Sequence, residues 1–190
     1  SGSITLQEPA VAGTTVLDLP ATSGTILTTG SSGQSIPKAA LPTGSVLQVV
    51  YGTYSTQVSS TSTSYVDTGL SLSITPTSAS SKILVSINQY VYMYDISSGI
   101  GVSVGFQIVR NSTNIFTSTS KEQFYLYVPN GPTRIDIATN VPLQYLDSPA
   151  TTSAVTYKTQ GALFDSAGNQ SVLYQGGNNY STITLMEIAA

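Results

Sequence analysis

Apolar and polar side chains alternate along most of the chain after residue 44. The clearest stretch places Val102, Val104, Phe106 and Ile108 at every second position, between Ser103, Gly105, Gln107 and Val109. A period of two is typical of β-strands with one buried face. The same pattern predicts strands with inward faces Leu70, Leu72 and Ile74, and Ile83, Val85 and Ile87. Further strands are expected at residues 46–51, 64–67, 114–120, 123–128, 134–138, 153–164, 170–174 and 182–188.

Turn-forming residues separate these segments, for example at residues 67–69 (DTG), 110–112 (RNS) and 176–179 (GGNN). No helical periodicity extends beyond a turn or two. Eight or more short strands at this spacing predict an all-β fold, a β-sandwich or a jelly-roll-like domain, over residues 44–190.

The first 43 residues have a different pattern. Short apolar groups are separated by frequent prolines and glycines, which disfavour helices and long paired strands. We expect an extended N-terminal arm whose apolar side chains anchor it in grooves of another chain, with a disordered linker as the alternative. The predicted anchors are Leu6, Val16, Leu17, Leu19, Ile26 and Leu27.

Charge and composition exclude several classes of partner. Charged residues make up 8% of the chain, against about a quarter in typical soluble proteins, and the net charge is −3. The six basic residues are scattered, so no patch follows a phosphate backbone and no nucleic acid is expected. No apolar run approaches the roughly 20 residues of a membrane helix, so no membrane is expected. The opening Ser-Gly-Ser is interpreted as a natural start after removal of an initiator methionine.

The chemistry-bearing residues are few. The chain has no histidine and no cysteine, which removes the usual catalytic triads and the commonest metal ligands. Paired carboxylates such as Asp136 and Asp147 could serve a glycosidase only if the fold brought them together. No calcium-binding loop is present, although one ligand per chain on a trimer axis would be enough for an ion. We therefore predict no enzyme, no cofactor, no catalytic residues and no metal ligands.

Two aromatic groups are the candidate binding residues. Tyr90, Tyr92 and Tyr94 are spaced to lie on one side of a strand, and the second group comprises Phe124, Tyr125 and Tyr127. Tyrosines with polar tips suit protein interfaces and sugar stacking alike. Packing at the rim of the core or at a subunit contact is the favoured interpretation, and glycan contact is the alternative.

Several segments resemble parts of virion structural proteins of tailed bacteriophages, both head decoration proteins and tail-fibre modules. The segments are residues 19–30 (LPATSGTILTTG), 41–50 (LPTGSVLQVV), 73–85 (SITPTSASSKILV), 145–158 (YLDSPATTSAVTYK) and 181–190 (STITLMEIAA). The resemblance implies a virion protein and a homotrimer, and none of these motifs is a catalytic signature.

Two functions follow from these expectations. The first is a non-enzymatic capsid decoration, or cement, protein on the exterior of the virion, anchored by its arm on the major capsid protein or other virion proteins. The second is a tail-fibre tip that recognises host surface glycans. A natural start at Ser1, with no upstream shaft, favours the capsid over the tail.

Overall fold

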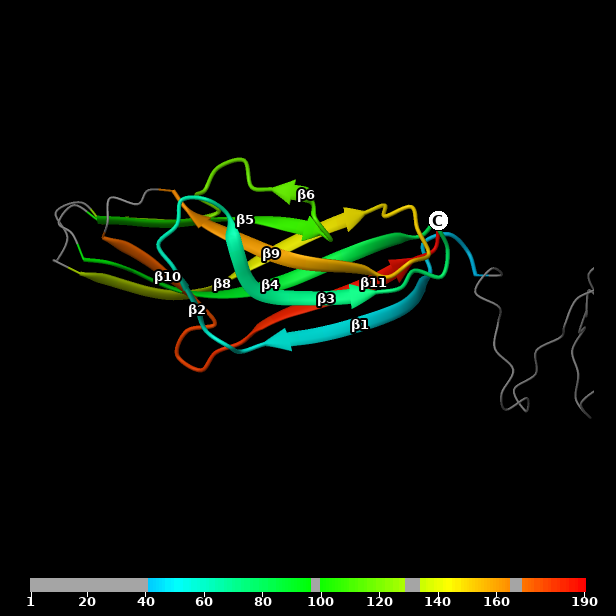
Figure 1. Ribbon diagram of the computed structural model, residues 1–190, viewed down its shortest axis with the longest axis horizontal. Coiled ribbons are helices and arrows are strands. Elements are labelled where there is room, and N and C mark those ends of the chain that lie inside the picture. The colour runs from blue at the N-terminus through cyan, green and yellow to red at the C-terminus, as the bar shows by residue number, and fades with distance from the viewer. Residues whose placement is uncertain (1–40, 97–99, 129–133, 165–168) are drawn as a thin grey trace, which may run out of the picture. The chain divides into compact units, whose positions relative to one another are not determined.

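The computed structural model describes residues 41–96, 100–128, 134–164 and 169–190, all within one structural unit, Lys38–Ala190. The described residues form strands and no helix (Figure 1). The strands are β1 (Val46–Tyr54), β2 (Val58–Ser60), β3 (Val66–Ile74), β4 (Lys82–Asp95), β5 (Ile100–Arg110), β6 (Thr113–Thr117), β7 (Phe124–Val128), β8 (Ile135–Asp147), β9 (Val155–Leu163), β10 (Gln170–Tyr174) and β11 (Ser181–Ile188).

The strands form two antiparallel sheets. In the first, called sheet A, β4 has β8 along one side and β11 followed by β10 along the other, and β1 and β2 continue outward from β11 and β10. In the second, sheet B, the order is β3, β9, β5, with β6 and β7 sharing the far side of β5. The all-β class is therefore confirmed.

The pairing shows a jelly roll. β1 pairs with β11, β3 with β9, β4 with β8, and β5 with β6 and β7. These pairs are nested in the sequence, as in one long hairpin that has been rolled up. β2 also pairs with β10 in sheet A, and if this pair is counted together with β1–β11, successive pairs fall alternately in sheet A and sheet B. A jelly roll divides its strands between two packed sheets in this way.

The core lies between the sheets and follows the alternation in the sequence. Its largest fully buried side chains include Phe106, Tyr157 and Tyr174, and the predicted inward positions of β4 and β5 are buried. Of the predicted inward face of β3, Leu70 and Ile74 are buried and Leu72 is half-buried. The period-two pattern therefore identified the core correctly in these three strands.

Two local predictions were wrong and one strand was missed. Residues 67–69 are not a turn but part of a continuous β3, which has an irregular register between Asp67 and Ser71. β2 was not predicted, because three residues are too few to show alternation. The strand expected to end at residue 138 continues through Pro142 to Asp147. Proline is accepted there because β8 lies at an edge of the described sheet A.

Polar side chains cross the core near the middle of β4. Gln89, which is fully buried, accepts at Oε1 from the Thr159 hydroxyl (2.8 Å) and donates from Nε2 to Ser181 Oγ (2.9 Å). Thr68 and Thr159 join their hydroxyls at 2.5 Å. The Gln175 amide is oriented so that its oxygen accepts from Gln89 Nε2 (2.7 Å) and its nitrogen donates to the Thr68 carbonyl (3.0 Å). This buried polar cluster links sheet A to sheet B.

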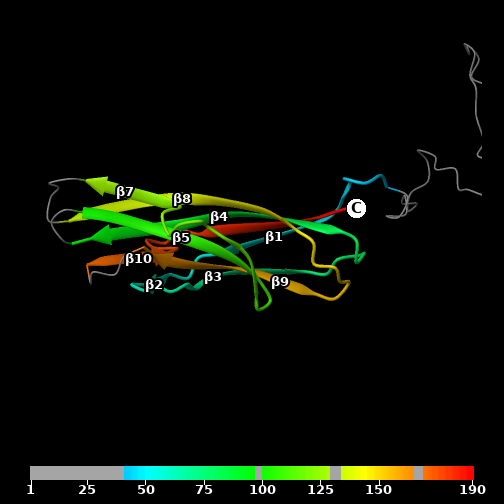
Figure 2. The ribbon, with the colours of Figure 1, turned by 90° about the horizontal axis from the view of Figure 1, so that it is seen from above.

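The two ends of the sandwich differ. The carboxyl terminus lies at the same end as the start of β1 (Figures 1 and 2), where Gly44 N donates to the Ala189 carbonyl at 2.8 Å. β2 and β10 lie at the opposite end. We call the first the proximal end, because residues 1–40 join the domain there, and the second the distal end.

Candidate interaction surfaces

The tyrosine row (Tyr90, Tyr92 and Tyr94) lies on the outer face of sheet A. The residues between and after these tyrosines on β4 point into the core and are buried, so the three tyrosine side chains point outward and are half-buried. The row is therefore not part of the sandwich core. It follows β4 toward the distal end.

A chain of polar contacts holds two of these rings. The Tyr92 hydroxyl donates to Asp136 Oδ1, and the Arg134 guanidinium donates to both oxygens of that carboxylate, each at 2.7 Å. The guanidinium carbon of Arg134 lies 4.8 Å from the centre of the Tyr94 ring, within cation–π range. The Tyr92 and Tyr94 ring centres are 6.2 Å apart. Hydrogen bonds from Arg134 and then Tyr92 lower the pKa of the Asp136 carboxyl to about 2.

A groove of about 330 Å³ opens beside Tyr94, on the side of β10 and β2. Its other lining residues are short or hydroxylated with one apolar exception: Ser59, Ser60, Thr61, Ser171 and Leu173. Tyr94 stands opposite Ser171 in the pairing of β4 with β10. This groove, which we call the distal groove, thus combines one aromatic wall with several hydroxyl groups.

The second aromatic group divides between two faces. Phe124 packs against the core, whereas Tyr125 and Tyr127 are exposed on the outer face of sheet B. Their rings stack at 6.5 Å between centres with planes 9° apart. They lean over Gly101 of the neighbouring β5, where an added Cβ would lie 3.4 Å from the Tyr125 ring. The two predicted aromatic groups therefore do not form one site.

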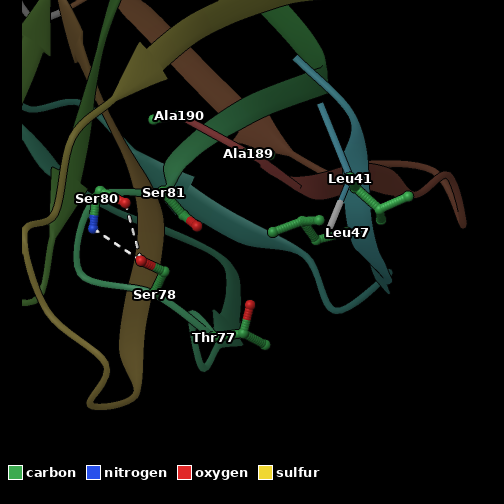
Figure 3. Close-up of a pocket in the computed structure, with 8 residues that line it drawn as sticks. All are labelled: Leu41, Leu47, Thr77, Ser78, Ser80, Ser81, Ala189 and Ala190. Carbon is green, nitrogen blue, oxygen red and sulfur yellow. Dashed lines mark hydrogen bonds between the residues drawn. The ribbon is translucent and has the colours of Figure 1, made fainter. Parts of the chain in front are cut away.

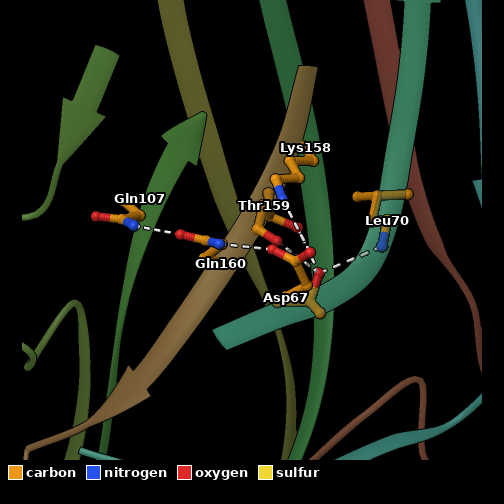
Figure 4. A network of polar contacts seen from close by, with 7 residues as sticks. Asp67, Leu70, Gln107, Lys158, Thr159 and Gln160 are labelled. Atoms are coloured by element: carbon orange, nitrogen blue, oxygen red, sulfur yellow. Dashed lines mark hydrogen bonds and ion pairs between the residues drawn. The ribbon is translucent and has the colours of Figure 1, made fainter. Parts of the chain in front are cut away.

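The rest of the outer face of sheet B is polar. Asp67 accepts from Lys158 Nζ at 2.8 Å and from Gln160 Nε2 at 2.6 Å (Figure 4). Gln160 is bonded in turn to Gln107, which accepts from Asn114 Nδ2 at 2.9 Å. These contacts connect β3, β9, β5 and β6. They consist of hydrogen bonds made by neutral amide side chains and of one ion pair, Asp67 with Lys158.

The outer face of sheet A carries an apolar row toward the proximal end. Val49, Met186, Leu84 and Leu146 are paired in register across β1, β11, β4 and β8. Val49 is 56% exposed and Leu146 is 49% exposed, while the two central residues are half-buried. The two outer faces of the sandwich thus differ in chemistry.

A shallow pocket of about 430 Å³ lies at the proximal end (Figure 3). It is lined by Leu41, Leu47 and the carboxyl-terminal Ala189 and Ala190 together with hydroxyl residues of the β3–β4 connection. Leu41 is the first described residue, so the pocket lies where residues 1–40 enter the domain. The predicted arm anchors, Leu6 to Leu27, lie outside the described residues.

The two carboxylates considered for catalysis do not meet. Asp136 and Asp147 lie on the same strand and on opposite faces of sheet A, 11 residues apart, or roughly 36 Å at about 3.3 Å per residue. Asp147 is buried, accepts from Arg110 Nη1 at 2.7 Å, and accepts from the Tyr157 hydroxyl at 2.7 Å. Burial and then the Asp147 carboxylate raise the pKa of Tyr157 well above its usual range. Asp147 therefore joins the sheets.

Within the described residues, no three His, Cys, Asp or Glu side chains gather as a metal site. These residues also contain no helix long and apolar enough to cross a membrane.

The sequence interpretation did not identify Arg134 and Asp136 as partners of the tyrosine row. Arg134 and Asp136 are two positions apart, which places both side chains on one face of a strand. This spacing was the sequence feature that could have indicated that they act together.

Comparisons with known proteins give a distant likeness. No protein-family model and no curated protein matches the chain. Among solved structures, the chain is similar to the VP2 subviral particle of infectious bursal disease virus, with 15% identity and a TM-score of 0.38. It is similar to the Gt strain of the same virus, with 16% identity and a TM-score of 0.37. Each match covers 77% of this chain and 39% of the other, so this chain spans about two fifths of their length. At these values the likeness carries no conclusion about function.

Proposed function

We propose that the protein is a structural component on the exterior of a tailed-phage virion. In this proposal it is a homotrimeric decoration, or cement, protein that stabilises the head and is anchored on the major capsid protein by its N-terminal arm. The observation that carries the proposal is the apolar row on the outer face of sheet A, which lies toward the end where residues 1–40 join the domain.

The apolar row suits contact with another protein subunit. Val49 and Leu146 are about half exposed in the single chain. Fully burying an exposed Val or Leu side chain contributes roughly 1.5–3 kcal/mol, so covering each of these half-exposed side chains contributes about half of that. The row carries no charge, so a neighbouring subunit covers it without burying an unpaired ion. The outer face of sheet B instead carries amide side chains and the exposed, stacked Tyr125 and Tyr127, whose rings have polar tips.

The arm supplies the second contact. Residues 1–40 can span up to about 130 Å at roughly 3.3 Å per extended residue, enough to cross a neighbouring subunit. The predicted anchors recur in short apolar groups, and three arms per trimer multiply a modest contribution from each chain. The resemblance of residues 19–30 to linkers of phage virion proteins supports the same role.

Two changes test the two contacts separately. Deleting residues 1–29 is expected to leave the domain folded and to abolish incorporation into virions. The double change Val49→Asp and Leu146→Asp places charges on the apolar row and is expected to convert the trimer to monomer in light scattering. Ser71→Asp, at an exposed position on sheet B, is the matched control and leaves the assembly intact. Normal incorporation of the deletion variant, or an unchanged mass of the double variant, contradicts the proposal.

Copy number and heat resistance separate the capsid from the tail. A decoration protein is present in hundreds of copies per particle, and its removal lowers the temperature at which heads release DNA while host adsorption continues. A few trimers per particle, with adsorption lost on removal and heat resistance kept, would place the protein in a tail fibre instead.

A further inference from the structure

We propose that the distal groove binds a neutral oligosaccharide. The inference is independent of whether the protein sits on the head or the tail, because it depends on the groove alone. A pocket with one aromatic wall and convergent hydroxyls is suited to a ligand that has apolar ring faces and many hydroxyl groups.

The aromatic wall is held before any ligand arrives. β8 and β10 flank β4 on opposite sides, so Arg134, which precedes β8, packs on Tyr94 from the side away from the groove. Arg134 is fixed by its two bonds to Asp136, and Asp136 also accepts from Tyr92. A ring held in this way loses little conformational freedom on binding, which lowers the entropic cost.

The groove's hydroxyls complement those of a sugar. Ser59 Oγ accepts from Gln57 Nε2 at 3.3 Å, and Ser60 Oγ accepts from Ser62 N at 3.0 Å. Ser59, paired with Leu173, therefore still has a proton to donate on the face that carries Tyr94, and Ser171, paired with Tyr94, adds another donor and acceptor there. Ser60 is paired with the buried Val172, so its side chain points to the other face of the sheet. Sugar hydroxyls are likewise both donors and acceptors. Short side chains leave space for a sugar ring, and Leu173, paired with Ser59, supplies an apolar contact beside that hydroxyl.

The local charge favours neutral over acidic sugars. Arg134 is the cation beside the tyrosine row, and the Asp136 carboxylate takes two of its hydrogen bonds at 2.7 Å. None of the described residues that line the groove is charged. A carboxylate or sulfate on the sugar would thus lack a free cation to pair with. The groove also lies at the distal end, away from the apolar row and from the point where residues 1–40 join.

Binding is tested with the full-length protein on a panel of immobilised oligosaccharides. The panel contains neutral chains of glucose, galactose, mannose and N-acetylglucosamine, each with a matched version that carries sialic or uronic acid. We expect binding to at least one neutral probe, no gain in affinity for its acidic counterpart, and a loss of at least tenfold with Tyr94→Ala. Because Tyr94 lies on the surface, this variant should keep the wild-type thermal unfolding.

Tyr125→Ala is the matched control, since it removes an exposed tyrosine from sheet B, and it should bind as the wild type does. The inference is overturned if no neutral probe binds, if the acidic versions bind more tightly, or if Tyr94→Ala binds unchanged. Virions that carry Tyr94→Ala should contain the normal amount of the protein. Loss of glycan binding with normal incorporation separates this inference from the anchoring role, which the arm deletion tests.

Discussion

Replacing Gln89 by leucine should destabilise the domain strongly, although the two side chains are similar in size. Gln89 is fully buried on β4 of sheet A, where it bonds to Ser181 of the same sheet and to Thr159 of sheet B. Without its amide, the Thr159 hydroxyl loses its acceptor on β4, and the Gln175 oxygen loses one of its two donors. Leucine is apolar and can replace neither bond.

The magnitude follows from the cost of unpaired polar groups. A buried donor or acceptor left without a partner costs about 1–3 kcal/mol, and three groups in this cluster each lose a bond, those of Thr159, Ser181 and Gln175, of which the last two keep other partners. The apolar contacts of leucine offset part of this cost. We therefore expect the free energy of unfolding to fall by roughly 2–4 kcal/mol, a large share of the 5–15 kcal/mol typical of a domain.

Urea unfolding at fixed protein concentration measures the effect, since association with other copies would otherwise change the apparent stability. The midpoint should fall while the slope stays the same. Gln144→Leu, at an exposed position on the outer face of β8, is the control and should change the midpoint little. A loss below about 0.5 kcal/mol for Gln89→Leu, or one equal to that of the control, would refute the view that the cluster's hydrogen bonds stabilise the sandwich.

Two further predictions concern acid stability and core packing. Burial raises the pKa of Glu187, but hydrogen bonds from Gln48 and Thr77 outweigh burial and hold it below its usual 4.5. This carboxylate thus contributes stability above pH 4.5 that is lost as the pH falls below that value. Glutamine cannot be protonated in this range, so the melting temperature of Glu187→Gln should decline less between pH 6 and pH 3 than that of the wild type. Equal declines would contradict this. An added Cβ at Gly161 would lie 2.3 Å from the buried Tyr174 hydroxyl, so Gly161→Ala should cost about 1–3 kcal/mol in thermal unfolding. Gly101→Ala, with 3.4 Å to its nearest atom, should be nearly neutral, and similar costs for both would refute the packing argument.

Prediction from the sequence succeeded where the signal was local. The alternation on β4 and β5 predicted which side chains point inward, because successive residues of any strand point to opposite faces. The same rule applies to Gln89, which lies in line with Val85 and Ile87 on the inward side of β4, although the sequence analysis did not single this residue out. A glutamine at such a position was the available sign of a buried polar contact, although its partners could not be named.

Prediction failed where an outcome depended on a neighbouring strand. A strand was expected only over residues 134–138, yet β8 continues through Pro142, which is tolerated because that strand has a partner on one side only in the described sheet. Phe124 was grouped with Tyr125 by its position in the sequence, whereas the pleat of β7 turns these side chains to opposite faces. The distal groove had no sequence signal, because Ser59 and Ser171 meet only through the pairing of β2 and β10.

The sequence by itself determined that the protein is all-β and which segments form most of its strands. It also determined that no histidine or cysteine is present as a catalytic or metal-binding partner for the acidic residues. These properties depend on composition and on backbone geometry within a few residues. The tertiary structure alone decided that the nested pairs roll into two sheets, that Asp136 and Asp147 face apart, and that Tyr94 borders a groove. Such contacts join residues as far apart as Gln48 and Glu187, 139 positions in the chain, and no local pattern specifies which distant strand a given strand will pair with.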